Sequence, residues 1–99
     1  MSQNPLEVFG RMDPQFLNHV NNGHEFALSD GALPKKIKLL MAMALDAAAG
    51  TVDGVRSLSQ AAIKAGATEA EICETLRVAQ FISEAGSTFT AGRALSELF

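Results

Sequence analysis

The segment from Pro34 to Gly50 constrains the fold more than any other part of this chain. Proline fits the first turn of a helix, and glycine is the commonest residue at a left-handed helix end. From Leu39 to Ala49 the segment is apolar on nearly every side, and Asp46 is its one charged residue. A helix of this kind belongs in the centre of a core or between subunits. We therefore expect a helical protein organised around this segment.

Capping signals divide the rest of the chain into further helices, and no stretch indicates a strand. Asp13 followed by Pro14 is typical of a helix start. Thr68 followed by Glu71 predicts a capping box, in which each side chain accepts a hydrogen bond from the other residue's backbone amide. The fold class that we expect is all-α, a compact bundle of five or six helices.

Glycines mark the expected helix ends. One helix should run from about residue 51 to Gly66, and the next from Thr68 to Gly86, with Ser87 capping a last helix. Residues 1–12 are expected to form an N-terminal arm or a short helix, and residues 13–99 a single domain. The apolar positions expected to face inward are Phe16, Leu17, Val20 and Ala27, then Val55, Leu58, Ala62 and Ile63, then Ile72, Leu76, Ala79 and Ile82.

Composition excludes several classes of function. The formal net charge is −3, with no Trp, no Tyr and no basic stripe, so we expect no nucleic-acid partner. The longest apolar run, Leu39 to Leu45, is too short to span a bilayer, and no signal segment leads the chain. We therefore expect a cytoplasmic protein without a membrane partner. Cys73 is the only cysteine, which excludes an intrachain disulfide and a Cys-x-x-Cys redox or zinc pair.

Three short signatures occur in a characteristic order: SDGALPKK at residues 29–36, GATEAEI at 66–72, and a closing stretch from EAG at 84–86 to RA at 93–94. Together they resemble the carboxymuconolactone decarboxylase and alkyl hydroperoxidase D family. The resemblance implies an all-helical, alkyl hydroperoxidase D-like subunit that assembles into trimers or hexamers, with its pocket near a subunit contact. We expect no cofactor.

The family's redox residues are missing from the corresponding positions. In the redox members a glutamate leads the central helix, and Cys-x-x-Cys-x-x-x-His follows its closing glycine. Those positions here read Leu39, Thr51, Gly54 and Leu58. A threonine without an adjacent base is a far weaker nucleophile than a thiolate, so thiol peroxidase activity is not expected. The decarboxylase branch dispenses with the cysteines but keeps a histidine at the position of Leu58, and that histidine is absent as well.

Four other residues are candidates for a site. Asp46 is a candidate acid or base because a carboxylate inside an apolar helix needs a partner or a raised pKa. Cys73 is the second catalytic candidate, although an inert cysteine explains it as well. Asp53 and Arg56 lie beside the vestigial redox positions and are candidates for binding an anionic ligand.

No metal site is expected. His19 and His24 are five residues apart, so they do not share a helix face as an i, i+4 pair would.

The leading hypothesis for function is a family member without thiol redox chemistry. It would be a homo-oligomer that binds a small molecule, or a non-redox enzyme of the lactone or decarboxylase type. One alternative is an active peroxidase or decarboxylase-type enzyme that uses Cys73 or Asp46. The other is a structural or interaction subunit of a catalytic homologue.

Overall fold

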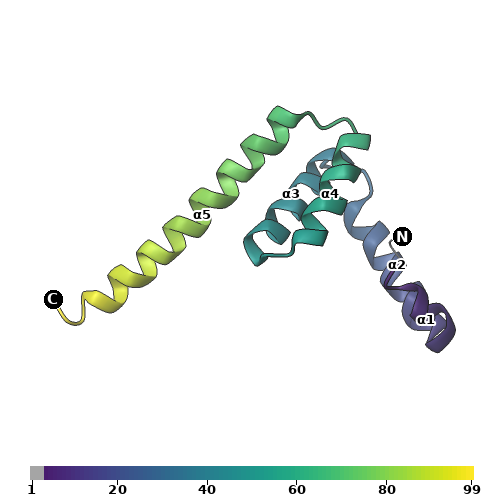
Figure 1. Cartoon of the computed structure of the whole chain (residues 1–99), viewed down its shortest axis with the longest axis horizontal. Coiled ribbons are helices and arrows are strands. Elements are labelled where there is room, and N and C mark those ends of the chain that lie inside the picture. The colour runs from purple at the N-terminus through teal and green to yellow at the C-terminus, as the bar shows by residue number, and fades with distance from the viewer. Residues whose placement is uncertain (1–3) are drawn as a thin grey trace.

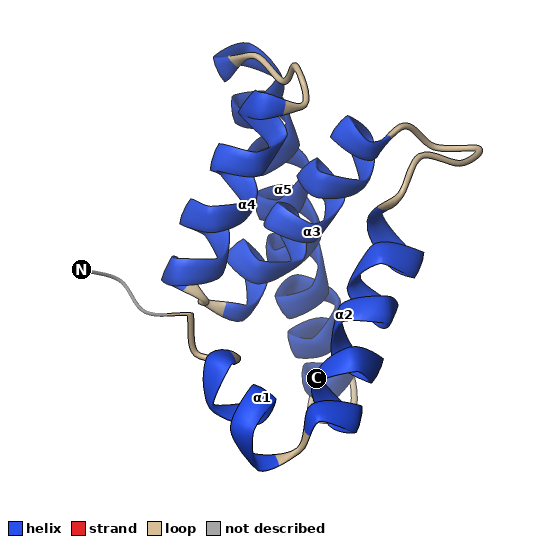
Figure 2. Cartoon of the chain, turned by 90° about the vertical axis from the view of Figure 1, so that its right-hand side faces the viewer, coloured by secondary structure: helices blue, strands red, loops and turns tan. Residues whose placement is uncertain are grey.

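The structure, a computed structural model, describes residues 4–99, and these residues contain helices and loops but no strand (Figure 2). The helices in chain order are α1 (Glu7–Met12), α2 (Pro14–Leu28), α3 (Lys35–Ala49), α4 (Val52–Lys64) and α5 (Glu69–Leu95). The prediction of an all-α fold with five or six helices is confirmed.

The helix boundaries that were predicted from capping residues are found at the predicted positions. The Asp13 side chain accepts a hydrogen bond from the Phe16 amide at the start of α2. Gly50 ends α3 in the left-handed conformation with φ of 78°, which glycine adopts without steric cost. Thr68 and Glu71 form the complete capping box of α5. Local hydrogen bonding therefore fixes the ends of three helices.

The prediction that Gly86 ends a helix and Ser87 starts another is wrong, because α5 continues unbroken to Leu95. The Ser87 hydroxyl donates a hydrogen bond to the Glu84 carbonyl within the same helix, at 2.9 Å, so it caps nothing. Gly86 keeps an ordinary helical φ. A single glycine costs a helix only about 1 kcal/mol relative to alanine, which is too little to end a long helix by itself.

The N-terminal segment is partly helical. Its helix α1 contacts α2, and the rings of Phe9 and Phe16 meet edge to face with centroids 5.2 Å apart. The short helix that the sequence allowed within residues 1–12 is therefore present, and residues 1–3 of that arm lie outside the described part of the chain.

The buried core is small and centres on α3. Three of its side chains come from α3, and α3 packs against α2, α4 and α5. The five buried residues are Leu39, Leu40, Met43, Ala62 and Ala67. Half-buried apolar side chains pack around them, namely Leu28, Ile37, Val55, Leu58, Ala61 and Ile72. The central position expected for this helix is thus confirmed.

Several apolar residues that should face inward are exposed instead. Ile63 is 56% exposed and Ile82 is 61% exposed, and Phe16 also lies at the surface. In Figure 1 the C-terminal half of α5 extends away from the other helices on one side, and α1 and α2 extend on the other. The radius of gyration is 17.6 Å, compared with about 13 Å for a compact chain of this length. The protomer is therefore more extended than the compact bundle that we expected.

Among the residues described, no helix has both the length and the apolar character that crossing a membrane requires.

The start of α5 is tied to α3 through Glu71. One carboxylate oxygen accepts the Thr68 amide at 2.9 Å, and the other lies 2.9 Å from Lys36 Nζ on α3. The hydrogen bond from the Thr68 backbone, followed by the hydrogen bond and charge of Lys36, holds the pKa of Glu71 below its usual range. The ionised form of Glu71 therefore favours the folded state.

The continuity of α5 predicts a strong effect of proline at position 87. Ser87→Pro should cost about 3 kcal/mol, because proline inside a helix removes a hydrogen bond and clashes with the preceding turn. Glu69→Pro is the matched control, since position 69 is the first helical residue and Thr68 before it has extended backbone angles. Chemical denaturation measures both. Equal tolerance of the two prolines would mean that a helix boundary lies near residue 87.

The lowered pKa of Glu71 predicts a pH-dependent contribution to stability. A group whose pKa is lower in the folded state stabilises the protein above its unfolded pKa, about 4.3, and loses that effect as the pH falls through the folded value. Glu71→Gln should therefore lower the thermal midpoint at pH 7, and the difference from the natural chain should shrink below about pH 4. Glu74→Gln, at an exposed position on the same helix, is the control. A difference independent of pH would contradict this account.

Candidate functional site

The four positions predicted to correspond to redox residues, Leu39, Thr51, Gly54 and Leu58, divide into two pairs. Leu39 is buried in the core, at 3% exposure, and Leu58 packs against that core. Thr51 precedes α4 and Gly54 lies in its first turn. The two leucines are thus part of the hydrophobic packing, and only the positions of Thr51 and Gly54 lie near the surface.

A recess lies between the N-terminal segment and α4, with a volume of about 770 Å³. Five of its seven lining residues have polar side chains, and we call it the polar recess. Its lining residues are Asn4 and Pro5 from the N-terminal segment, and Asp53, Gly54, Arg56, Ser57 and Gln60 from α4. The recess therefore contains one vestigial position, Gly54, together with both predicted ligand-binding candidates.

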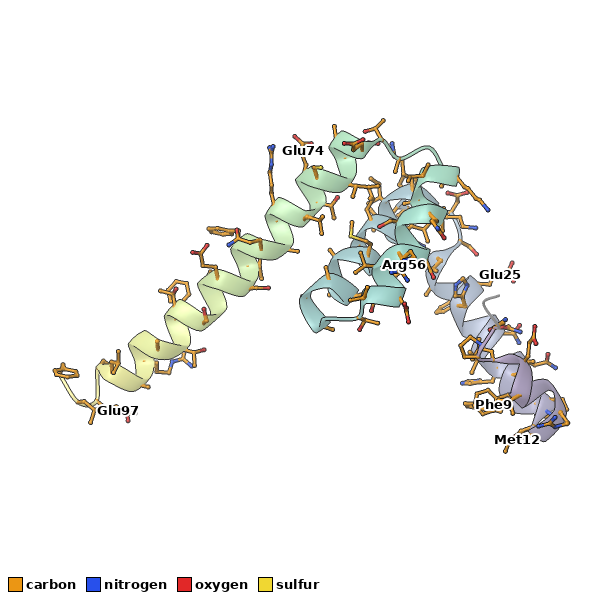
Figure 3. The ribbon with its side chains drawn as sticks, viewed as in Figure 1. Phe9, Met12, Glu25, Arg56, Glu74 and Glu97 are labelled. Carbon is orange, nitrogen blue, oxygen red and sulfur yellow. The ribbon has the colours of Figure 1, made fainter. Side chains whose placement is uncertain are left out.

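Asp53 and Arg56 form an ion pair across one helical turn, with Arg56 Nη1 2.9 Å from Asp53 Oδ1. The Arg56 side chain is 62% exposed and that of Asp53 is 94% exposed. An ion pair as exposed as this contributes little to stability, so its partners are free to exchange for a ligand. Figure 3 shows Arg56 on the helix hairpin formed by α3 and α4.

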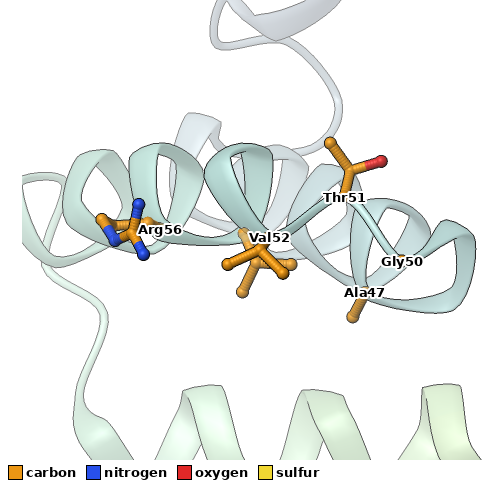
Figure 4. Close-up of a pocket in the computed structure, with 6 residues that line it drawn as sticks. Ala47, Gly50, Thr51, Val52 and Arg56 are labelled. Atoms are coloured by element: carbon orange, nitrogen blue, oxygen red, sulfur yellow. The ribbon is translucent and has the colours of Figure 1, made fainter. Parts of the chain in front are cut away.

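A smaller, apolar hollow lies next to the polar recess and shares Arg56 with it. It has a volume of about 280 Å³ and is lined by Ala47, Gly50, Thr51, Val52, Val55 and Arg56. In Figure 4 the Ala47 and Val52 side chains point toward the side on which α5 runs, whereas Thr51 points the other way. Ala47 also lines a hollow of about 260 Å³ between α3 and α5. We call these two apolar hollows together the apolar trough.

Asp46 lies on the last turns of α3 and is half-buried. Its carboxylate faces the first turn of α4, where Gly54 leaves room for it. The backbone carbonyl of Asp46 also accepts the Thr51 amide, at 2.9 Å. The structure therefore places Asp46 beside two of the vestigial positions, Thr51 and Gly54.

The remaining candidates lie apart from this site. Cys73 is exposed on α5 and lines neither the polar recess nor the apolar trough. His19 and His24 are exposed on α2. Within residues 4–99 no cluster of three His, Cys, Asp or Glu side chains has the geometry to hold a metal ion.

The sequence of this chain matches a known family. A family model described as "Carboxymuconolactone decarboxylase family" matches residues 14–97. The chain belongs to the carboxymuconolactone decarboxylase family. The matched region runs from the first residue of α2 to just beyond α5, so it contains all of α4 and leaves out α1 and the Asn4 side of the polar recess. Searches among curated proteins and among solved structures find no match.

Membership of the carboxymuconolactone decarboxylase family was inferred correctly from the signatures, and the structure brings Asp53 and Arg56 into one recess. Ser57 and Gln60 were missed as lining residues. Their spacing from Asp53, at i+4 and i+7, is a polar stripe on one face of α4 and was available as a signal. The contact between Asp46 and Gly54 had no local signal, because a turn separates the two residues.

Proposed function

We propose that this member of the carboxymuconolactone decarboxylase family binds a small organic anion in the polar recess, without thiol redox chemistry, and works as a homo-oligomer. The single observation that carries the ligand proposal is the recess itself, in which Arg56 stands beside Gly54. The family description suggests a lactone that bears a carboxylate as the ligand class.

The chemistry of the lining supports an anionic, oxygen-rich ligand. The planar guanidinium of Arg56 is suited to bidentate binding of a carboxylate, and its present partner Asp53 is weakly held. Ser57 and Gln60 provide further hydrogen-bonding groups on the same helix.

The absence of thiol chemistry is supported by the residues at the vestigial positions. The side chains of Leu39 and Leu58 cannot act as an acid or a base. Leu39 lies in the core and Leu58 packs against it. Cys73 is one exposed thiol outside the recess, and no second cysteine exists to resolve a sulfenic acid. We therefore propose binding or non-redox chemistry for this recess.

The apolar surface of the protomer supports the proposal of a homo-oligomer. The chain exposes 7841 Å², whereas a compact monomer of 10.5 kDa is expected to expose about 5,400 Å². The excess of about 2,400 Å² is well above the roughly 800 Å² that each partner loses in a standard interface. A trimer or a hexamer, in which each subunit has more than one contact, fits an excess of that size.

The surface proposed to be covered in the oligomer is the outer half of α5 with the apolar trough beside it. Exposed large apolar side chains follow one another along this helix, namely Val78, Phe81, Ile82, Phe89 and Leu95. A run of this length on a single protein is a sign of an interface. A second copy of the chain is the occupant that we propose.

The ligand proposal predicts selective binding of a carboxylated lactone. In a titration followed by NMR, 5-oxotetrahydrofuran-2-carboxylate should bind and shift the amide signals of α4, and Arg56→Gln should weaken its affinity about tenfold, equivalent to 1.4 kcal/mol. The neutral γ-butyrolactone should be insensitive to that substitution because it has no charge for Arg56 to meet.

Arg77→Gln is the matched control for this titration, because Arg77 lies on α5 and lines neither the recess nor the trough. It should leave the affinity for the lactone acid unchanged. Equal loss of affinity in the Arg56 and Arg77 variants would show that the acid responds only to net charge, and the recess would not be the site.

The assembly proposal predicts a defined oligomer at micromolar concentration. Native mass spectrometry should show a trimer or hexamer, and Phe89→Asp should dissociate it because a carboxylate buried in an apolar interface is not solvated. Gln15→Asp, at an exposed position on α2, should leave the oligomer intact. A monomeric natural chain at that concentration would contradict the proposal.

A further inference from the structure

Gly54 and Asp46 stand in an unusual steric relation. A Cβ atom built on Gly54 would lie 2.8 Å from Asp46 Cγ and closer still to Asp46 Oδ2. Real side chains do not approach so closely, so any residue other than glycine at position 54 must move the carboxylate. Both atoms belong to the end of a flexible, half-buried side chain, so the carboxylate can move aside, and what it loses is its place against α4.

The place that the carboxylate occupies is electrostatically favourable. It lies against the first turn of α4, where free amide groups and the helix dipole attract negative charge. Thr51 stands at the N-cap of this helix, but its side chain makes no capping hydrogen bond. The Asp46 carboxylate, contributed by the preceding helix, adds to the negative charge that Asp53 already places in this first turn.

We infer that Asp46 and Gly54 form a coupled pair, in which any side chain at position 54, a cysteine included, displaces the Asp46 carboxylate from α4 and so destabilises the chain. Its bearing on the redox motif rests on the predicted correspondence of position 54 to the second cysteine of the redox members. It does not depend on ligand binding in the polar recess.

The pair has a consequence for restoring the lost motif. A cysteine at position 54 would displace the carboxylate from α4, and a carboxylate that stayed nearby would disfavour the thiolate, which is the reactive form of cysteine. A cysteine at position 54 should therefore be better tolerated once Asp46 has been replaced.

A double-mutant cycle tests the coupling through thermal midpoints measured at one protein concentration. Gly54→Ala in the natural chain should lower the midpoint by about 4 °C or more, because the carboxylate loses its place. In the Asp46→Ala background the same change should raise the midpoint by about 4 °C, because alanine has a higher helix propensity than glycine. Gly54→Cys, measured under reducing conditions, should also lower the midpoint only when Asp46 is present.

Gly23→Ala is the matched control, since Gly23 is also helical and a Cβ there meets nothing within 4 Å. It should change the midpoint by the same amount in both backgrounds. A rise after Gly54→Ala in both backgrounds, or an equal fall in both, would overturn the inference.

A second measurement on the natural chain does not depend on any variant. NMR should detect a nuclear Overhauser contact between the Asp46 β protons and the Gly54 α protons. Its absence from a spectrum in which both residues are assigned would also overturn the pairing. Neither measurement involves a ligand. A negative result would therefore overturn the coupled pair but would not bear on the proposed binding of a lactone acid.

Discussion

The packing of α3 against α4 around Met43 is the interaction on which the rest of the structure depends. Met43 is fully buried, and the core cluster that contains it comes mainly from α3 and α4, which are joined by a turn of two residues. Only five residues of the described chain are buried, which is a small core for 99 residues. Such a core holds the α3–α4 hairpin and the start of α5, but it leaves the outer half of α5 without neighbours. The extended shape of the protomer follows from that shortage of internal packing.

The same core explains why leucines stand at two of the four positions predicted to correspond to the family's redox residues. Leu39 is almost completely buried, and an ionised glutamate in its place would need a partner to offset the loss of solvation. Leu58 packs against the same cluster, so a histidine there would face an apolar surface. Each leucine adds apolar contact to a core in which only five residues are buried. In a member without thiol chemistry, these positions therefore serve the fold.

How far the sequence predicts this structure depends on the range of the interactions involved. The ends of α2, α3 and α5 that rest on capping were predictable, because the capping residue and its amide partner are at most a few residues apart. The continuity of α5 through Gly86 was not, since one glycine is an ambiguous signal whose cost depends on the residues around it. The exposure of Ile63 and Ile82 was also missed. Periodicity identifies an apolar face but does not say whether the same chain covers it or a partner does.

The candidate site shows the same difference between features that neighbouring residues determine and features that depend on contacts between helices. Asp53 and Arg56 could be selected from the sequence because they lie on the first turns of one helix, three residues apart. Asp46 was recognised only as an anomaly, one charge in an apolar helix, and burial with a raised pKa was the natural interpretation. Its actual neighbour, Gly54, lies across a turn on the next helix.

Neither Asp46 nor Gly54 is informative alone, since glycine near a helix start is common and a carboxylate near a helix end has many possible roles. The chemical meaning of each appears only when the hairpin brings them together. The carboxylate then occupies the space that a side chain at position 54 would take. It can do so only because residue 54 is a glycine.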